Sequence, residues 1–186
     1  MAEELIDVLD EHGNKTGVVL PRSEVHEKEL RHASVFVWIY NSKGEVLLQH
    51  RAKDKKIFSD VWDVSVAGHI TAGDEPVEAA IREVSEEIGI AINPSELIQV
   101  DYTFDVAPWP PDKTHPEFCW VYILQKELDP KKLAIQYDEL SAVRLESIDA
   151  LEAARKQAGH EKIYANRNTR IYDVAFAEIR KRLHEG

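Results

Sequence analysis

Short runs in which hydrophobic and polar residues alternate recur along the chain, and this two-residue period is typical of β-strands. Two such runs flank Gly13 and Asn14 within residues 4–20 and predict a β-hairpin. Residues 21–30 are polar and predict a connection with a single helical turn. Further strands are predicted where aromatic and β-branched residues are dense, at 33–40, 45–52, 60–70, 97–107, 117–125 and 141–148.

Three other segments place apolar residues three and four positions apart, which predicts helices at 75–88, 149–159 and 168–183. Prolines between residues 108 and 116 are expected to hold the connection between two strands extended. Strands interleaved with helices favour an α/β fold, in which helices cover a mixed β-sheet. Apolar positions of the last helix include Ile171, Val174, Ala175 and Ile179.

Length and composition narrow the class of protein. A chain of 186 residues can bury a sizeable core, and residues 158–168 do not read as a linker, so one domain over residues 1–186 is expected. The hairpin, about residues 1–30, would be an extension, and a helix at about 168–184 would end the domain. The net charge of −11 argues against a nucleic acid polymer or an anionic membrane as partner. The lone Cys119 and the absence of an apolar leader favour a cytoplasmic protein.

The helix predicted at 75–88 ends in three crowded glutamates, Glu83, Glu86 and Glu87. Asp74 is expected to be its N-cap, and Pro76 lies in the first turn, where proline is tolerated. The spacing of three and four residues brings the carboxylates together on one flank of the helix. The core-facing stripe beside them consists of Val77, Ile81, Val84 and Ile88.

Like charges at this spacing cost roughly 0.2–0.5 kcal/mol per pair, and the helix dipole repels anions at the C-terminal end. One interpretation is a solvated acidic face. The other is a site for a hard divalent cation such as Mg²⁺, which binds clustered carboxylates and phosphate oxygens. Small Ala79 and the preceding loop Ala67-Gly68-His69 leave room for a ligand, and they favour the cation.

The stretch from Gly68 to Ile90 resembles the Nudix box, in which a Gly, a Glu and an Arg-Glu-apolar-x-Glu-Glu-x-Gly-apolar run follow at fixed spacing. One position departs, since Asp74 stands where the pattern has Glu, and its pairing with Arg82 is expected to be looser. The resemblance implies an α/β/α sandwich, Mg²⁺ or Mn²⁺, and hydrolysis of a diphosphate. It implies metal ligation by Gly68, Glu83, Glu86 and Glu87, with Glu83 and Glu86 also catalytic.

Residues 51–69 are similar to the corresponding region of type I isopentenyl-diphosphate isomerase, a family that shares the Nudix fold. The resemblance implies that Arg51 and Lys55 bind the diphosphate, with Lys56 assisting. Together with Lys53, these residues form a basic island in an acidic chain, which agrees with anion binding. The alternative is a solvated loop.

The same resemblance extends to a second metal or substrate site. His26, His32 and His69 fit the three histidines of the isomerase family, with the first spacing one residue short. Glu117 fits its catalytic glutamate, and His115 replaces the neighbouring glutamate ligand. A structural role is the alternative for each histidine.

Ala67 is the decisive departure from the isomerase pattern, because it replaces the catalytic Cys. A methyl group cannot transfer a proton, and Cys119 lies elsewhere on a predicted strand. We therefore expect a metal-dependent Nudix hydrolase that cleaves a small organic or nucleoside diphosphate. An isopentenyl-diphosphate delta-isomerase and a non-catalytic Nudix-fold binding module are the alternatives. Whether the protein forms a homodimer is left open. Trp38, Trp62, Trp109 and Trp120 could stack a base or line an isoprenoid pocket, but most of them are expected to pack in the core.

Overall fold

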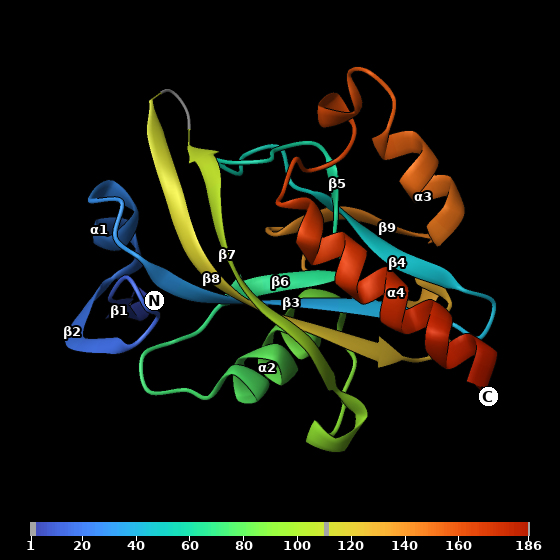
Figure 1. Ribbon diagram of the computed structural model, residues 1–186, viewed down its shortest axis with the longest axis horizontal. Coiled ribbons are helices and arrows are strands. Elements are labelled where there is room, and N and C mark those ends of the chain that lie inside the picture. The colour runs from blue at the N-terminus through green and yellow to red at the C-terminus, as the bar shows by residue number, and fades with distance from the viewer. Residues whose placement is uncertain (1–2, 110–111, 186) are drawn as a thin grey trace.

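A computed structural model of the chain describes residues 3–109 and 112–185 (Figure 1). The strands are β1 (Leu5–Leu9), β2 (Lys15–Pro21), β3 (His32–Tyr40), β4 (Glu45–Arg51), β5 (Trp62–Asp63), β6 (Val66–His69), β7 (Ile98–Trp109), β8 (Lys113–Gln125) and β9 (Leu140–Ser147). The α-helices are α1 (Arg22–Glu27), α2 (Pro76–Ile88), α3 (Ile148–Arg155) and α4 (Thr169–Glu185). Short 3₁₀ turns lie at Pro94–Glu96, Pro130–Lys132 and His160–Lys162.

Seven strands form the main sheet, in the order β5-β4-β3-β8-β7, with β6 also paired to β3 and β9 to β4. Strands β3 and β8 are parallel, whereas the other pairs are antiparallel, so the sheet is mixed as predicted. Strand β6 pairs with β3 at Ser34–Val37, and β4 meets β3 at Tyr40. The two strands on this side of β3 therefore diverge, and the sheet opens between them.

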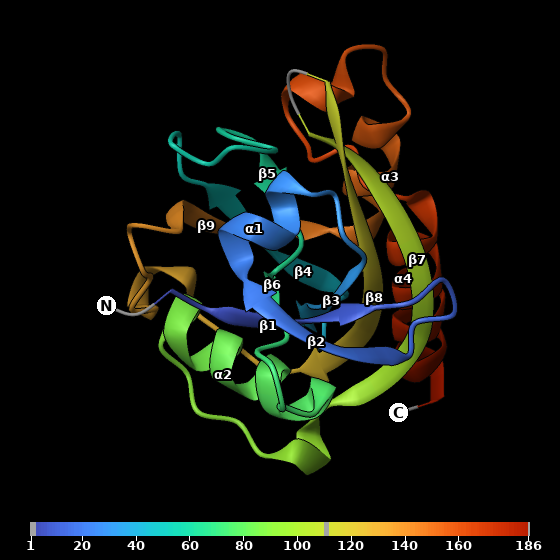
Figure 2. The ribbon, with the colours of Figure 1, turned by 90° about the vertical axis from the view of Figure 1, so that its left-hand side faces the viewer.

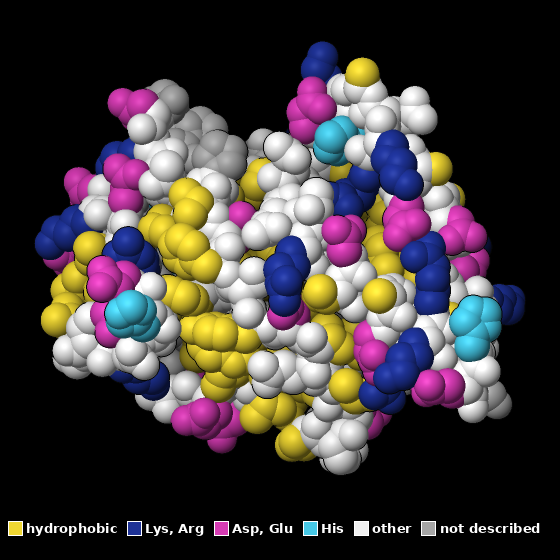
Figure 3. All heavy atoms as spheres, viewed as in Figure 1, with side chains coloured by type: hydrophobic (Ala, Val, Ile, Leu, Met, Phe, Trp, Pro, Cys, Tyr) yellow, Lys and Arg dark blue, Asp and Glu magenta, His cyan; other side chains and the backbone are white. Residues whose placement is uncertain are grey.

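Helices cover both faces of the sheet, which confirms the predicted α/β/α sandwich (Figure 1). Helix α2 packs its apolar stripe, including Val84 and Ile88, against Val35 and Val37 of β3. Helices α3 and α4 pack on the opposite face, around Trp38, and their outer sides carry many charged side chains (Figure 3). Burial of these aromatic and aliphatic side chains supplies the main stabilisation of the fold. The α4 residues in that core are Ile171, Tyr172, Ala175, Phe176 and Ile179.

The N-terminal hairpin forms as predicted and lies with α1 at one end of the molecule (Figure 2). It has a small core of its own, made by Ile6, Val8 and Val25. Ile6 also forms a β-bridge with Thr71, so the hairpin is joined to the segment that follows β6. This contact brings α1 and its His26 to the edge of the main sheet.

Two predicted details are wrong. The N-cap of α2 is Glu75, not Asp74, because Glu75 and Glu78 form a reciprocal capping box around Pro76. The proline-rich connection is also mostly strand, since β7 and β8 continue to Trp109 and from Lys113.

Pro116 is accommodated in β8 because it lies beyond the start of β3. At this position β8 is paired with β7 alone, through Val106. The strand predicted at 60–70 is divided by Ser65, whose hydroxyl accepts from Ile39 N at 2.8 Å and donates to Leu47 O at 2.6 Å.

Among the described residues, no helix is both long and apolar enough to cross a membrane.

Candidate active site

A cavity of about 680 Å³ opens where the sheet diverges. Its walls come from α1, β3, β6, α2, β8, the segment after β4 and the segment before α4. The structure brings together at this cavity Arg51, Lys55, Lys56, Gly68, Glu83, Glu86, Glu87, Glu117, His26, His69 and His115. His32, the other candidate from the sequence, is fully buried and contacts the rings of these histidines.

Helix α2 presents its glutamates to the cavity at different depths. Glu87 is 3% exposed and accepts a hydrogen bond from Ala67 N at 3.3 Å, whereas the Glu86 side chain is 54% exposed. The Glu83 carboxyl lies so close to Gly68 that any Cβ at this position would overlap it. A side chain at position 68 would therefore displace the Glu83 carboxyl from its place beside the backbone of β6.

The buried glutamates resist ionisation. Burial raises the pKa of Glu83 to about 7, although the neighbouring Arg82 guanidinium opposes the shift. Burial and then the charge of Glu83 raise the pKa of Glu87 well above its ordinary value. Two neighbouring carboxylates that are costly to ionise together suit a divalent cation as ligands. The backbone of Gly68, which carries no side chain, lies beside them. The residues present therefore fit the metal that the Nudix box implies.

Arg82 joins α2 to the end of β6. Its Nη2 donates to His69 O at 3.0 Å and to Thr71 Oγ1 at 3.3 Å, and its Nη1 donates to Glu83 Oε1 at 2.6 Å. The nearest oxygen of Asp74 lies 3.9 Å from Nε of Arg82, beyond hydrogen-bonding distance. The shorter Asp thus pairs loosely with Arg82, as expected.

Only part of the basic island is solvated, since Lys53 and Lys56 are exposed whereas Arg51 and Lys55 are partly buried. Arg51 ends β4 with its side chain 14% exposed, and its Nε donates to Phe58 O at 3.0 Å. Lys55 faces the cavity in an ion pair with Glu139, a lining residue that the sequence did not indicate. Lys53 instead points to solvent, with 81% of its side chain exposed.

Two further residues of the site, Asp63 and Arg167, were missed from the sequence. Arg167 donates from Nε and Nη2 to the buried Asp63 carboxylate at 2.7–3.1 Å. Arg51 Nη1 lies 3.6 Å from the same carboxylate. Burial opposes ionisation of Asp63, but Arg167 outweighs it and leaves the pKa of Asp63 below its ordinary value. The one available signal in the sequence was the position of Asp63 within a predicted strand, because a buried charge needs a partner of opposite charge.

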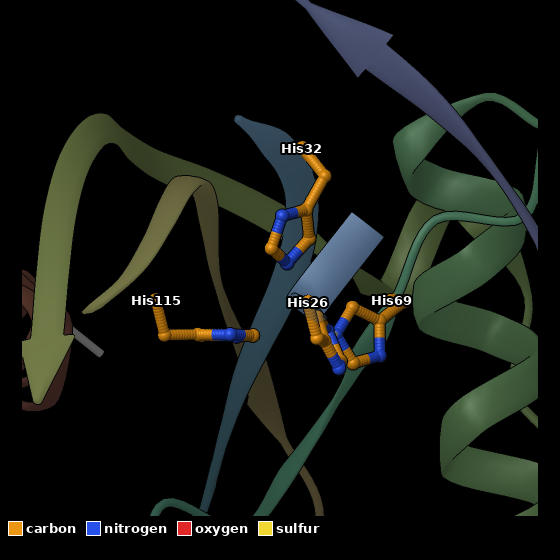
Figure 4. A group of neighbouring side chains, drawn as sticks. All are labelled: His26, His32, His69 and His115. Atoms are coloured by element: carbon orange, nitrogen blue, oxygen red, sulfur yellow. Dashed lines mark hydrogen bonds between the residues drawn. The ribbon is translucent and has the colours of Figure 1, made fainter. Parts of the chain in front are cut away.

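Four histidines from four elements converge beside the cavity (Figure 4). They come from α1, β3, β6 and β8, and their ligand atoms all lie within 4.8 Å of one another. The Nε2 atoms of His26 and His69 are 3.2 Å apart. Converging imidazoles at such distances are typical of a metal site.

Three of the histidines are held neutral. Burial lowers the pKa of His26 to about 3 and the pKa of His32 to about 4, and it lowers the pKa of His69 well below its ordinary value. His32 Nδ1 donates to Leu30 O at 2.8 Å, since a carbonyl can only accept. Its Nε2 therefore keeps a lone pair, and among the described residues this atom has no hydrogen-bond partner. A buried lone pair of this kind fits a metal ion.

Glu117 is the anionic partner of the histidine cluster. It accepts a hydrogen bond from the Ser34 hydroxyl and lies 3.1 Å from His115 Nε2. Burial opposes its ionisation, but His115 and then His32 outweigh burial and hold the pKa of Glu117 well below its ordinary value. Cys119 is buried away from the cavity lining, and burial raises the pKa of its thiol well above the ordinary value. Ala67 lines the cavity and offers only a methyl group at the position that matches the catalytic Cys of the isomerase family.

The NUDIX domain family model matches residues 30–166, about three quarters of the sequence. The chain belongs to the Nudix family. The match begins after α1 and ends before α4, so it contains the divergent part of the sheet and the glutamate-bearing helix.

Curated relatives of the Nudix chain include both hydrolases and an isomerase. It is 44% identical to Nudix hydrolase 3 of Arabidopsis thaliana over 105 residues, which are 56% of this chain but only 14% of that protein. It is 34% identical over 161 residues to an uncharacterized Nudix hydrolase of Clostridium acetobutylicum, covering 83% of this chain and 74% of that one. It is 31% identical over 155 residues to isopentenyl-diphosphate Delta-isomerase of Escherichia coli, covering 81% and 84%.

Solved structures share the fold. A protein from Deinococcus radiodurans superposes with a TM-score of 0.70 at 22% identity, covering 96% of this chain and 98% of that one. A MutT protein from Methanosarcina mazei has a TM-score of 0.52 at 21% identity, covering 83% and 94%. At these identities the likeness establishes the Nudix fold alone.

The depressed pKa of His32 predicts a pH-dependent stability of the metal-free protein. Between pH 6.5 and about 4 the unfolded chain binds a proton that folded His32 does not, so the free energy of unfolding falls as the pH falls. At pH 5 the loss due to His32 is about 2 kcal/mol. Glu83, whose pKa is raised, acts in the opposite direction over this range.

Urea unfolding of the wild type and of His32→Gln, at pH 7.5 and pH 5 with a chelator, isolates the His32 contribution. The wild type is expected to lose about 2 kcal/mol more than the variant on acidification. Equal losses in the two proteins would show that His32 titrates normally.

Proposed function

We infer that this Nudix protein is a divalent-metal-dependent hydrolase of a small diphosphate, organic or nucleoside-linked. One observation supports this above the others: the glutamates of α2 and the cations Arg51 and Lys55 line the same cavity. A carboxylate cluster suits Mg²⁺ or Mn²⁺, and a cationic cluster opposite suits the diphosphate that such an ion accompanies.

The proposed metal ligands are Gly68, through its backbone carbonyl, and Glu83, Glu86 and Glu87. A bound Mg²⁺ or Mn²⁺ supplies Lewis acidity towards water and phosphoryl oxygens. Ionised Glu83 or Glu86 receives a proton from the attacking water. The water oxygen bonds to one phosphorus, the bridging oxygen leaves with the other phosphoryl group, and two phosphate-bearing products result.

Arg51, Lys55 and Lys56 orient the diphosphate in this proposal. Arg51 is held by Asp63 and by the Phe58 carbonyl, so its guanidinium enters the reaction already positioned. Lys55 exchanges its partner Glu139 for a phosphate oxygen when substrate binds. Lys56 lies at the same wall of the cavity.

Isomerisation of an alkenyl diphosphate is disfavoured by two residues. Protonation of an alkene creates a carbocation, and a second group must then remove a proton. Ala67 cannot take part in proton transfer, and Arg167 places a cation 4.0 Å from Glu117, where the carbocation would form. A cation buried in this position raises the energy of a positively charged intermediate.

We further propose that the four histidines, with Glu117 beside them, hold a second metal ion. Support comes from the neutral state of His26, His32 and His69 and from the free lone pair of His32. Imidazole donors suit Zn²⁺ and other late transition metals as well as Mn²⁺. Such an ion would stabilise the packing of α1 against the sheet.

Substitution of the α2 glutamates is expected to change activity and stability in opposite directions. Glu83→Gln and Glu87→Gln should each lower turnover of diphosphates by about 10²-fold or more. Glu87→Gln should raise the free energy of unfolding of metal-free protein at pH 8, since it removes a buried charge that Glu83 repels. Released phosphate and urea unfolding are the measurements.

Glu78→Gln is the matched control on the same helix, because a glutamine keeps the capping box. It should leave both quantities close to wild type. Wild-type turnover in both active-site variants would refute the proposed metal site.

The histidine cluster predicts a metal-dependent rise in stability. Zn²⁺ at 100 times its dissociation constant is expected to add about 2.7 kcal/mol to the free energy of unfolding. His115→Asn should abolish most of this increment, whereas His12→Asn, at an exposed site on the hairpin, should not. An equal increment in wild type and His115→Asn would place the bound ion elsewhere.

The hydrolase proposal predicts that isopentenyl diphosphate is not isomerised. Wild-type protein with Mg²⁺ should give no dimethylallyl diphosphate, because loss of one acid–base group typically costs ~10²–10⁴-fold. NMR of the alkene protons follows the reaction directly. Efficient formation of the isomer would reject the hydrolase in favour of the isomerase.

A further inference from the structure

Arg167, just before α4, is an immobilised cation at the cavity wall. Its residue exposure is only 6%, yet it lines the cavity. Nε and Nη2 are both engaged by Asp63, at 2.7–3.1 Å. The guanidinium also lies over the rings of Phe36 and Phe58, 4.7 and 5.0 Å from their centroids. The Asp63 carboxylate and the two rings therefore fix the orientation of the guanidinium plane before any ligand binds.

The third nitrogen of Arg167 remains available. Among the described residues Nη1 donates no hydrogen bond, and its nearest carboxylate oxygen, Glu117 Oε2, is 4.0 Å away. That distance is too long for a hydrogen bond. Nη1 can therefore donate to an acceptor on a group that binds in the cavity.

Glu117 supplies the complementary acceptor. Its Oε1 is engaged by Ser34 and His115, while Oε2 is the oxygen nearest to Nη1 of Arg167. A fixed donor and a fixed anionic acceptor about 4 Å apart match a hydroxyl, which accepts from one and donates to the other. A second anionic group would be repelled by Glu117, and a hydrocarbon would leave both polar groups unsatisfied.

The rest of the lining agrees with a polar ligand. Apart from Gly68, only Phe36, Ile57 and Ala67 are apolar among the described residues that line the cavity. Phe36 is 1% exposed and already stacks on Arg167. A prenyl chain would therefore find few apolar side chains to contact.

We propose that Arg167 is a specificity-determining residue which, together with Glu117, selects a hydroxylated organic moiety on the diphosphate substrate. The substrate class is then a diphosphate ester of a sugar or another polyol, and prenyl diphosphates are rejected. This assignment rests on the proposed hydrolase function. Sites that hydrogen-bond a substrate hydroxyl can reject an analogue without it by about 10⁴–10⁵-fold, so a single donor–acceptor pair can dominate selectivity.

The test compares two probes, ADP-ribose and isopentenyl diphosphate, with Mg²⁺ and wild-type protein or Arg167→Met. Wild type is expected to favour ADP-ribose in kcat/KM by at least ~100-fold, within the range of such rejection. Arg167→Met should lower this preference by at least ~10-fold, through ADP-ribose alone. Arg170→Met is the matched control, because Arg170 forms a similar bidentate pair with Asp101 but is exposed.

Arg167→Met also removes a partner of buried Asp63, and thermal unfolding of each variant reports that effect. The double variant Asp63→Asn/Arg167→Met leaves no buried carboxylate without Arg167. It also releases Arg51, which lowers kcat/KM for both probes alike, and it should show the same loss of preference between them. Equal losses of kcat/KM for both probes, or a wild-type preference for isopentenyl diphosphate, would overturn the proposal. If wild type hydrolyses neither probe, the hydrolase function fails instead. The binding of both probes, measured by calorimetry, then decides the role of Arg167. Selective binding of ADP-ribose that Arg167→Met abolishes would support the proposal. Equal binding of the two probes would refute it.

Discussion

One buried carboxylate, Asp63, determines how the cationic part of the cavity is arranged. It forms hydrogen bonds to Arg167 and lies 3.6 Å from Arg51, so a single negative charge fixes two guanidinium groups that would otherwise repel each other. Two long side chains lose their rotamer freedom during folding and not during substrate binding. The divergence of β4 from β6 along β3 makes the space in which this triad lies. Removing the carboxylate would release both arginines at once, which is why the organisation of the site depends on a residue that does not line the cavity.

The two ends of the cavity have opposite preferences for charge. At α2, burial favours the protonated forms of Glu83 and Glu87, and a cation is needed to hold both as carboxylates. At β8, Glu117 stays ionised because His115 and His32 surround it. The carboxylates at α2 therefore need an added positive charge to ionise together, whereas Glu117 is already ionised and can offer an acceptor. Carboxylates of identical chemistry acquire different roles from their surroundings alone.

The Nudix box could be predicted from the sequence because its residues lie within one helix and the turn before it, where spacing fixes geometry. The mixed sheet followed from strand periodicity, and the four histidines were found by resemblance, although their convergence depends on four separate elements. Asp63 and Arg167 could not be paired in advance, because 104 residues separate them and no local pattern links them. Glu139 was missed for the same reason. The N-cap at Glu75 and the length of β7 and β8 were decided by backbone hydrogen bonding, which competes with simple residue preferences.

The ion pair between Lys55 and Glu139 makes the two proposed ligands of the cavity interdependent. A phosphate that takes Lys55 sets Glu139 free, and Glu139 already contributes to the repulsion that raises the pKa of Glu87. Binding of the anion therefore adds an unneutralised carboxylate to the acidic wall and increases the affinity of that wall for a cation. By thermodynamic reciprocity, a bound cation must tighten the anion by the same factor. Under the proposed function, the cavity would thus resist loading by either ligand alone and would favour the metal–diphosphate pair.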